Sequence, residues 1–140
     1  MTSRTPSIRL AFAAFLAFHG LVHLLGFVVP WQLATTPDFA YTTTAAWGAL
    51  DLGDTGARAV GLVMLALAIA YPVAAFGVWH ATRWALPAVI AATLVSVVVT
   101  ILQAPAAVLG LLLNVGILAA LVVDRASGDP VRVARPAGER

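Results

Sequence analysis

The chain has 140 residues, of which 61% are hydrophobic and only 10% are charged. A soluble domain carries about 25% charged residues, so this composition indicates that lipid covers most of the surface of a single domain. The chain contains no cysteine, which excludes disulfides, thiolate metal sites and a cysteine nucleophile. All eight basic residues are arginines, and no basic stripe with interleaved aromatic residues is present, so nucleic acid is not expected as a partner.

Four apolar segments have, or approach, the length of about 20 residues that a helix needs to cross a bilayer. Their central stretches hold no charged residue, and lipid requires backbone polar groups to be satisfied within the segment, so each is predicted to be a helix. The segments are 10–29, 59–78, 84–102 and 106–123. The predicted fold is all-α: a polytopic membrane protein with an up-down bundle of four transmembrane helices in one domain, 1–126. The first segment is longer than the roughly 7–15 apolar residues of a signal peptide, so we expect it to be retained.

The arginines predict the orientation of the bundle. Seven of them fall on one side if the chain crosses four times: in the N-terminal segment, at Arg83 and in the C-terminal tail. Only Arg58 falls on the other side. The positive-inside rule then predicts a multi-pass protein of the cell's inner (plasma) membrane with both termini in the cytoplasm. The polar tail, 127–140, is predicted to be disordered there.

The outer loop between the first two helices, Pro30 to Gly56, is longer than most connections in helical bundles. Its aromatic and β-branched residues lead us to expect that it folds back over the mouth of the bundle. Asp54 is predicted to N-cap the second helix and to pair with Arg58. Asp51 is either part of the same cap or a residue at the mouth of a pocket.

Two histidines, His19 and His23, lie four residues apart near the end of the first segment, and therefore on one face of the helix. Ionisable residues within a bilayer tend to face the bundle interior or a water-filled cavity. Three interpretations remain open: a metal or haem site, a polar pocket for an organic ligand, and structural hydrogen bonding to neighbouring helices. No other His, Asp or Glu lies in the predicted spans to complete a zinc site, so metal and cofactor stay undetermined.

Other polar residues lie at similar depth in the later helices. At about 1.5 Å per residue, Asn114 is about 12 Å from the outer end of its helix, and Thr100 and Gln103 lie in the same half of the membrane. We therefore expect His19, His23, Asn114, Thr100 and Gln103 to line one interior site. Ser96 is expected to bond its own helix backbone, and Tyr71-Pro72 to kink the second helix.

Three motifs resemble those of small four-helix bacterial membrane proteins that have no established activity. They are His-Gly-Leu-Val-His-Leu-Leu-Gly-Phe in the first helix, Asp-x-Gly-x-Arg-x-x-Gly-Leu from Asp54, and Ala-x-x-x-Gly-x-x-x-Asn ending at Asn114. The composition is typical of a GC-rich, actinobacterial genome. The general plan is also similar to that of DoxX-like proteins, in architecture alone, which carries no function. The resemblance implies a site made of the two histidines, Asp54, Arg58 and Asn114.

The function expected from these observations is non-enzymatic: the protein binds a lipid-like molecule, or a partner membrane protein, within the bilayer. The alternative is an enzyme or redox component that acts on a lipophilic substrate through His19 and His23. No nucleophile–base pair, phosphate-binding loop or nucleotide motif is present to favour a particular reaction.

Overall fold

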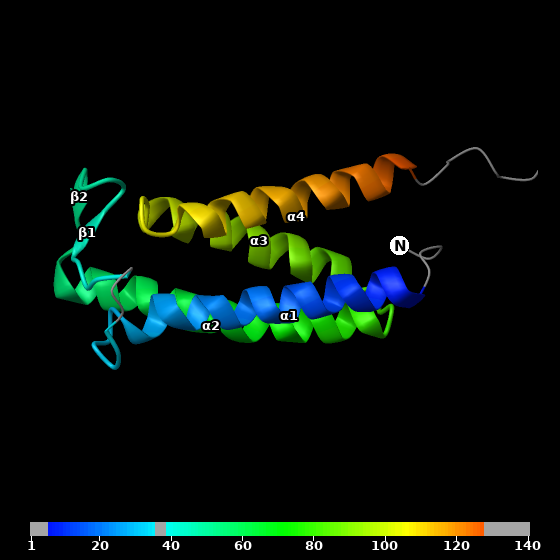
Figure 1. Ribbon diagram of the computed structural model, residues 1–140, viewed down its shortest axis with the longest axis horizontal. Coiled ribbons are helices and arrows are strands. Elements are labelled where there is room, and N and C mark those ends of the chain that lie inside the picture. The colour runs from blue at the N-terminus through cyan, green and yellow to red at the C-terminus, as the bar shows by residue number, and fades with distance from the viewer. Residues whose placement is uncertain (1–5, 36–38, 128–140) are drawn as a thin grey trace, which may run out of the picture.

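The computed structural model describes residues 6–35 and 39–127. In this part of the chain there are four helices and a two-stranded antiparallel sheet, and the helices run alternately up and down (Figure 1). The elements are α1 (Pro6–Val28), β1 (Thr44–Ala45), β2 (Leu50–Asp51), α2 (Gly53–Trp79), α3 (Ala85–Leu102) and α4 (Val108–Ser127). The predicted all-α helical bundle is confirmed. Ser127, the first residue of the predicted tail, belongs to α4, and the rest of that tail lies outside the described residues.

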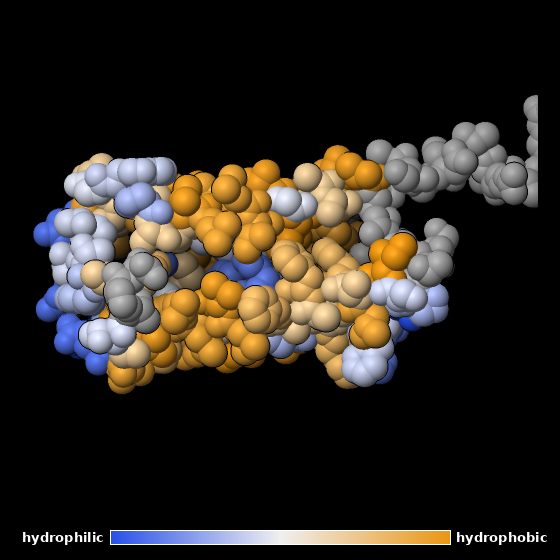
Figure 2. Space-filling view, in the orientation of Figure 1, coloured by the Kyte–Doolittle hydropathy of each residue, from blue (hydrophilic) through white to orange (hydrophobic). Residues whose placement is uncertain are grey.

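Three of the described helices, α1, α2 and α3, are long and apolar enough to cross a membrane, whereas the apolar part of α4, Val108–Val123, is shorter. Large apolar side chains point outward along the bundle; Phe18 is 68% exposed and Leu109 is 67% exposed. Apolar residues cover the middle of the molecule in the view of Figure 2, and hydrophilic residues gather towards its ends. Such a surface is stable in lipid and not in water.

Helices α1 and α2 begin before the apolar segments that predicted them, whereas α4 begins at Val108, two residues after its predicted start at 106. Helix α2 begins at Gly53, six residues before the predicted start at 59, and α1 begins at Pro6 instead of residue 10. The apolar pattern marks the length that lipid can cover. The helix itself continues into polar turns, because each further residue adds a hydrogen bond to an existing helix. The predicted start of α3 differs by only one residue.

Glycines let α1 lie directly against α2. A Cβ atom added at Gly20 would lie 2.7 Å from Cδ of Pro72 and 2.8 Å from Cβ of Tyr71, and one added at Gly26 would lie 2.8 Å from Cγ of Met64. Small residues permit this close approach of two backbones, which is how helices associate when lipid supplies no hydrophobic drive. Helix α2 runs through Pro72 without a break in the helix.

The bundle is not closed evenly around its axis. Each helix packs against the next one in the chain, α1 on α2, α2 on α3 and α3 on α4, whereas α1 and α4 hardly meet. In Figure 1, α4 lies along α3 and stands apart from α1. The seam between α1 and α4 is therefore the least packed part of the bundle.

The loop between α1 and α2 covers one end of the bundle, as expected from its residues. The backbone N–H of Ala46 donates to the carbonyl of Leu102 over 2.8 Å, and that of Trp47 donates to Ala104 over 3.1 Å. These bonds fix the β1–β2 turn to the end of α3. The turn contains Gly48, which has a positive φ of 82° that glycine adopts without strain.

The predicted N-cap at Asp54 is wrong. The N-cap position of α2 is Leu52, without a side-chain cap, and Asp54 lies in the first helical turn. The carboxylate of Asp54 accepts a hydrogen bond from the hydroxyl of Tyr41. Among the residues that the structure describes, no ion pair joins Asp54 to Arg58. The loop thus provides the partner for Asp54, because its fold brings Tyr41 over the start of α2.

Candidate ligand site between α1 and α4

A buried hydrogen-bond network links the middles of the four described helices. His19 of α1 contacts Oδ1 of Asn114 on α4 through Nε2, at 3.0 Å. His23, one turn later, contacts the hydroxyl of Ser96 on α3 through its own Nε2, at 2.7 Å. The amide nitrogen of Asn114 donates to the same hydroxyl over 2.7 Å, and the hydroxyl of Tyr71 on α2 donates to Oδ1 of Asn114 over 3.0 Å. Asn114 is therefore the residue on which three helices converge.

The position of each proton in this network follows from one backbone carbonyl. Nδ1 of His23 lies 2.9 Å from the carbonyl oxygen of His19, so Nδ1 carries the proton and Nε2 of the neutral ring accepts. The Ser96 hydroxyl must then donate to His23, which leaves it to accept from the amide nitrogen of Asn114. The Asn114 amide atom that faces His19 is consequently the oxygen, so His19 must donate to this oxygen through a protonated Nε2.

This assignment leaves one ring nitrogen without a partner. A neutral His19 that carries its proton on Nε2 has a bare acceptor at Nδ1. That atom is buried and makes no hydrogen bond to any residue described by the structure. The whole His19 side chain is only 2% exposed. A buried acceptor without a donor costs about 1–3 kcal/mol, so this nitrogen is the weak point of an otherwise satisfied network.

The aromatic rings around this network hold one another in place. The His19 ring meets the His23 ring and the Tyr71 ring edge-on, with 4.8 Å between centroids in both pairs. The Tyr71 hydroxyl also contacts that of Thr93 at 3.3 Å, and Thr93 bonds the carbonyl of Val89 on its own helix. Gly20 makes this cluster possible, because it lets α1 come close enough to α2 for both histidines to contact Tyr71.

A cavity of about 320 Å³ opens beside the two histidines, between α1 and α4. Figure 2 shows a small hydrophilic area set between the apolar surfaces near the middle of this face. Phe18 and Leu109, two strongly exposed residues, belong to the cavity wall, so the cavity opens sideways onto the exposed apolar surface of the bundle. The remaining wall residues are apolar or uncharged: His19, Val22, His23, Leu25, Gly26, Phe39, Met64, Thr100, Gln103, Ala106, Ala107, Gly110 and Leu113.

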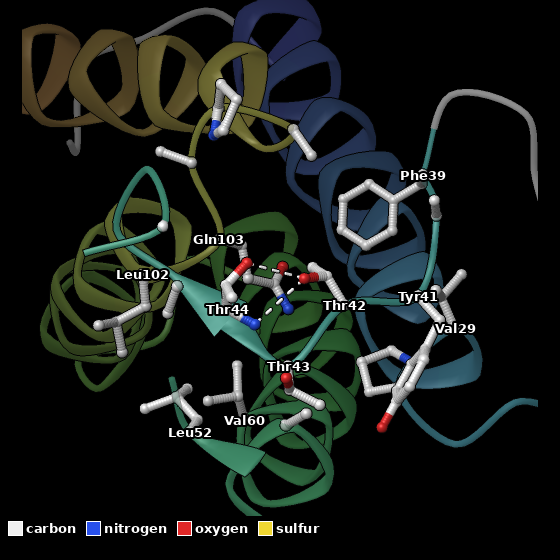
Figure 3. Close-up of a pocket in the computed structure, with 18 residues that line it drawn as sticks. Val29, Phe39, Tyr41, Thr42, Thr43, Thr44, Leu52, Val60, Leu102 and Gln103 are labelled. Carbon is white, nitrogen blue, oxygen red and sulfur yellow. Dashed lines mark hydrogen bonds between the residues drawn. The ribbon is translucent and has the colours of Figure 1, made fainter. Parts of the chain in front are cut away.

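A second cavity, of about 130 Å³, lies under the loop between α1 and α2 (Figure 3). Its wall includes Thr42, Thr43 and Thr44 from the loop, and Thr42 and Thr44 bond each other through their hydroxyls at 2.8 Å. Phe39 and Gln103 belong to the walls of both cavities. The cavity between α1 and α4, hereafter the lateral cavity, therefore extends as far as this loop, where the second cavity begins.

The structure brings together some of the predicted site residues and separates others. His19, His23 and Asn114 share the network, and the histidines also line the lateral cavity with Thr100 and Gln103. The Thr100 hydroxyl bonds carbonyls of its own helix, at Ser96 and Val97, so it takes no part in the network.

The three predicted loop residues are not part of either cavity wall. Asp54 bonds Tyr41, and Arg58 provides its backbone carbonyl to the indole N–H of Trp31 at 3.2 Å. Asp51 accepts a bond from the N–H of Gly53, which, together with a bond from Thr43, lowers the pKa of the Asp51 carboxyl. These residues stabilise the loop at the start of α2.

Two network residues escaped the sequence interpretation. Ser96 was expected to bond its own backbone and instead joins His23 to Asn114, and Tyr71 was considered only for its position before Pro72. One signal pointed to Tyr71: it is a hydroxyl-bearing aromatic residue in the middle of a span, where a buried hydroxyl needs a partner. No such signal distinguishes Ser96, since a serine in a membrane helix can satisfy itself locally.

Comparison with protein-family models, with curated proteins and with solved structures found no match for this chain. The resemblance to small four-helix bacterial membrane proteins therefore stays a prediction, as does enzymatic or redox chemistry at the histidines. In the described part of the chain, no group of three or more His, Cys, Asp or Glu residues could hold a metal ion.

Proposed function

We propose that this protein binds a lipophilic molecule that enters from the bilayer through the lateral cavity between α1 and α4. One observation carries the proposal: an apolar cavity opens onto the exposed apolar side of the bundle, and two histidines, His19 and His23, belong to its wall. Ligand sites commonly combine an apolar wall with a few polar groups that orient the bound molecule.

The opening between α1 and α4 also suits this function mechanically. Helix α1 packs tightly on α2 through Gly20 and Gly26, so the α1–α4 seam can widen without disturbing those contacts. The bond between His19 and Asn114 crosses the seam and limits how far the two helices separate. A ligand can therefore enter while the bundle keeps its fold.

The proposal is tested by filling the cavity. Ala107 of the cavity wall, in the turn just before α4, is replaced in the variant Ala107→Trp, and the exposed Ala120 of α4, outside the wall, is replaced in the control Ala120→Trp. Each protein is purified in mild detergent, and its retained lipophilic molecules are identified by native mass spectrometry. We expect retention by the wild type and by the control, and loss of retention in Ala107→Trp. Equal retention in all three proteins would show that the bound molecules are only surface lipid.

We further propose that the bundle lies in the plasma membrane with both termini in the cytoplasm and the β1–β2 hairpin outside. The arginine distribution supports this orientation, and the start of α1 and the end of α4 lie at the same end of the molecule (Figure 1). A reporter fused after Arg140 should read as cytoplasmic and one inserted near Thr43 as external. An external signal from the C-terminal fusion would contradict the orientation.

A further inference from the structure

We infer that the occupant of the lateral cavity is an uncharged lipid with a free hydroxyl group, which donates a hydrogen bond to Nδ1 of His19. This inference rests on the proposed function and names the class of molecule that the cavity accepts. Three independent features lead to it: the absence of charge among the described residues of the wall, the direction of the hydrogen bonds in the network, and the size and opening of the cavity.

The wall of the cavity excludes a charged head group. No Lys, Arg, Asp or Glu is among the described residues that line it. A phosphate or carboxylate transferred from water into such a wall would lose its hydration without gaining a cation, and an amine would gain no anion. Phospholipids and fatty acid anions therefore fit poorly, whereas an uncharged head group enters at low cost.

The network determines that the head group must donate. The carbonyl of His19 fixes the proton of His23 on Nδ1, and the sequence of bonds through Ser96 and Asn114 then fixes the proton of His19 on Nε2. The acceptor that remains, Nδ1 of His19, is buried and has no partner among the described residues. A ketone, ester or ether oxygen cannot satisfy it, because these groups only accept, whereas a hydroxyl group can.

The other polar groups of the wall do not change this preference. The hydroxyl of Thr100 is already bonded to its own helix. Gln103 lies at the end of the cavity nearest the loop, and its amide can both donate and accept, so it selects against neither kind of head group. Discrimination between a donor and an acceptor thus depends on His19.

The dimensions of the cavity indicate how much of the lipid it holds. A volume of about 320 Å³ is at the small end of the range for ligand pockets, about 300–1,000 Å³. Because the cavity opens sideways, the hydroxyl end of the lipid and the first part of its hydrocarbon chain fit inside, while the rest of the lipid stays in the bilayer. Nδ1 is enclosed by its neighbours, so the wall side chains must shift as the hydroxyl group arrives. A long-chain or prenyl alcohol has the required chemistry.

The test compares two probes with the same hydrocarbon chain: a prenyl alcohol, which can donate, and its methyl ether, which can only accept and is one methyl group larger. The full-length protein, with ¹⁵N-labelled histidines, is placed in nanodiscs of zwitterionic phospholipid, and each probe is titrated into the lipid. We expect the alcohol to shift the ¹⁵N resonance of His19 Nδ1 and to bind at least about tenfold more tightly than the ether, since it satisfies a buried acceptor. Equal binding of both probes, or no shift with the alcohol, would overturn the inference.

A pair of variants locates the discrimination at this residue. His19→Gln keeps both a donor and an acceptor, so part of the preference for the alcohol should survive; His19→Leu should abolish it. If His19→Leu does not fold, the titration of the wild type with the two probes still tests whether the cavity prefers the alcohol. Retention that is lost in Ala107→Trp, together with equal binding of both probes, would leave the proposed function intact and reject this inference. Absence of any retained molecule in the wild type would reject the proposed function itself.

Discussion

The two sides of α1 face very different neighbours. Towards α2, Gly20 and Gly26 bring the backbones so close that a single added Cβ atom would collide with Pro72, Tyr71 or Met64. Towards α4, the same helix leaves a cavity of about 320 Å³ and reaches its neighbour through the His19–Asn114 hydrogen bond. One seam is held by close contact of surfaces and the other by a polar bridge.

This difference separates the tightly packed seam from the seam to which we assign the proposed function. The dry, glycine-lined seam between α1 and α2 makes many short contacts, which add up even though each is weak. The α1–α4 seam gives up those contacts and gains an opening to lipid. The α1–α2 pair therefore fixes the positions of the histidines, whereas their contact with α4 depends on the hydrogen bond to Asn114.

The largest effect is expected from damage to the tight seam. Gly20→Leu should destabilise the protein by about 3 kcal/mol, because the new side chain has to displace the ring of Pro72 and the Cβ of Tyr71, which are fixed to the α2 backbone. Thermal unfolding in detergent measures the loss. The matched control is Gly116→Leu on α4, where an added Cβ meets nothing within 4 Å and the stability should change by less than about 0.5 kcal/mol. Equal stability of the two variants would contradict the contrast between the seams.

Removal of the bridge across the open seam should have the next largest effect. Asn114→Leu removes three interhelical hydrogen bonds and leaves polar groups of His19, Tyr71 and Ser96 without this partner. Interhelical bonds in membranes average about 0.6 kcal/mol each, so we expect a loss of about 2 kcal/mol.

The control for this variant is Thr100→Val, since the Thr100 hydroxyl bonds only its own helix. It should cost less than about 0.5 kcal/mol in the same unfolding assay. A Thr100→Val variant as unstable as Asn114→Leu would show that the seam is held by packing and not by the amide.

Within the network, Ser96→Ala should cost more than Tyr71→Phe. Loss of the Ser96 hydroxyl leaves both the His23 nitrogen and the Asn114 amide without their partner, which we expect to cost about 1 kcal/mol. Loss of the Tyr71 hydroxyl leaves Oδ1 of Asn114 still bonded to His19, so the cost should be nearer 0.5 kcal/mol, on the order of one interhelical bond. Unfolding curves of the two variants under one set of conditions decide between this order and its reverse.

The smallest effect is expected at the exposed polar pair over the bundle mouth. Tyr41 donates to the Asp54 carboxylate, and this bond raises the pKa of the phenol above its ordinary value of 10.0 because it stabilises the protonated form. Asp54→Asn should therefore lower the pKa of Tyr41 and leave the thermal stability unchanged. The absorbance of tyrosinate measures the pKa, in a Tyr71→Phe background that leaves Tyr41 as the sole tyrosine. An unchanged titration would show that the pair does not form in solution.

Part of the site could be predicted from the sequence. The spacing of His19 and His23 placed both on one face of α1, and the absence of charge within the spans indicated that polar groups would turn inward to meet one another. Asn114 was included on the same grounds, from its depth in the fourth helix, and all three residues belong to the network. Depth alone did not separate Thr100, whose hydroxyl bonds its own backbone, from Ser96, which bonds two other helices.

The all-helical character of the protein and the approximate position of its spans follow from the sequence by itself. An uninterrupted apolar segment in lipid has to satisfy its backbone internally, whatever surrounds it. The tertiary structure decided which neighbours meet. Gly20 contacts Pro72 and Tyr71 because of how α1 lies on α2. Ser96 bonds His23 because α3 turns the side that carries Ser96 towards α1. The opening between α1 and α4 also required the structure, because a cavity exists only where packed helices fail to meet.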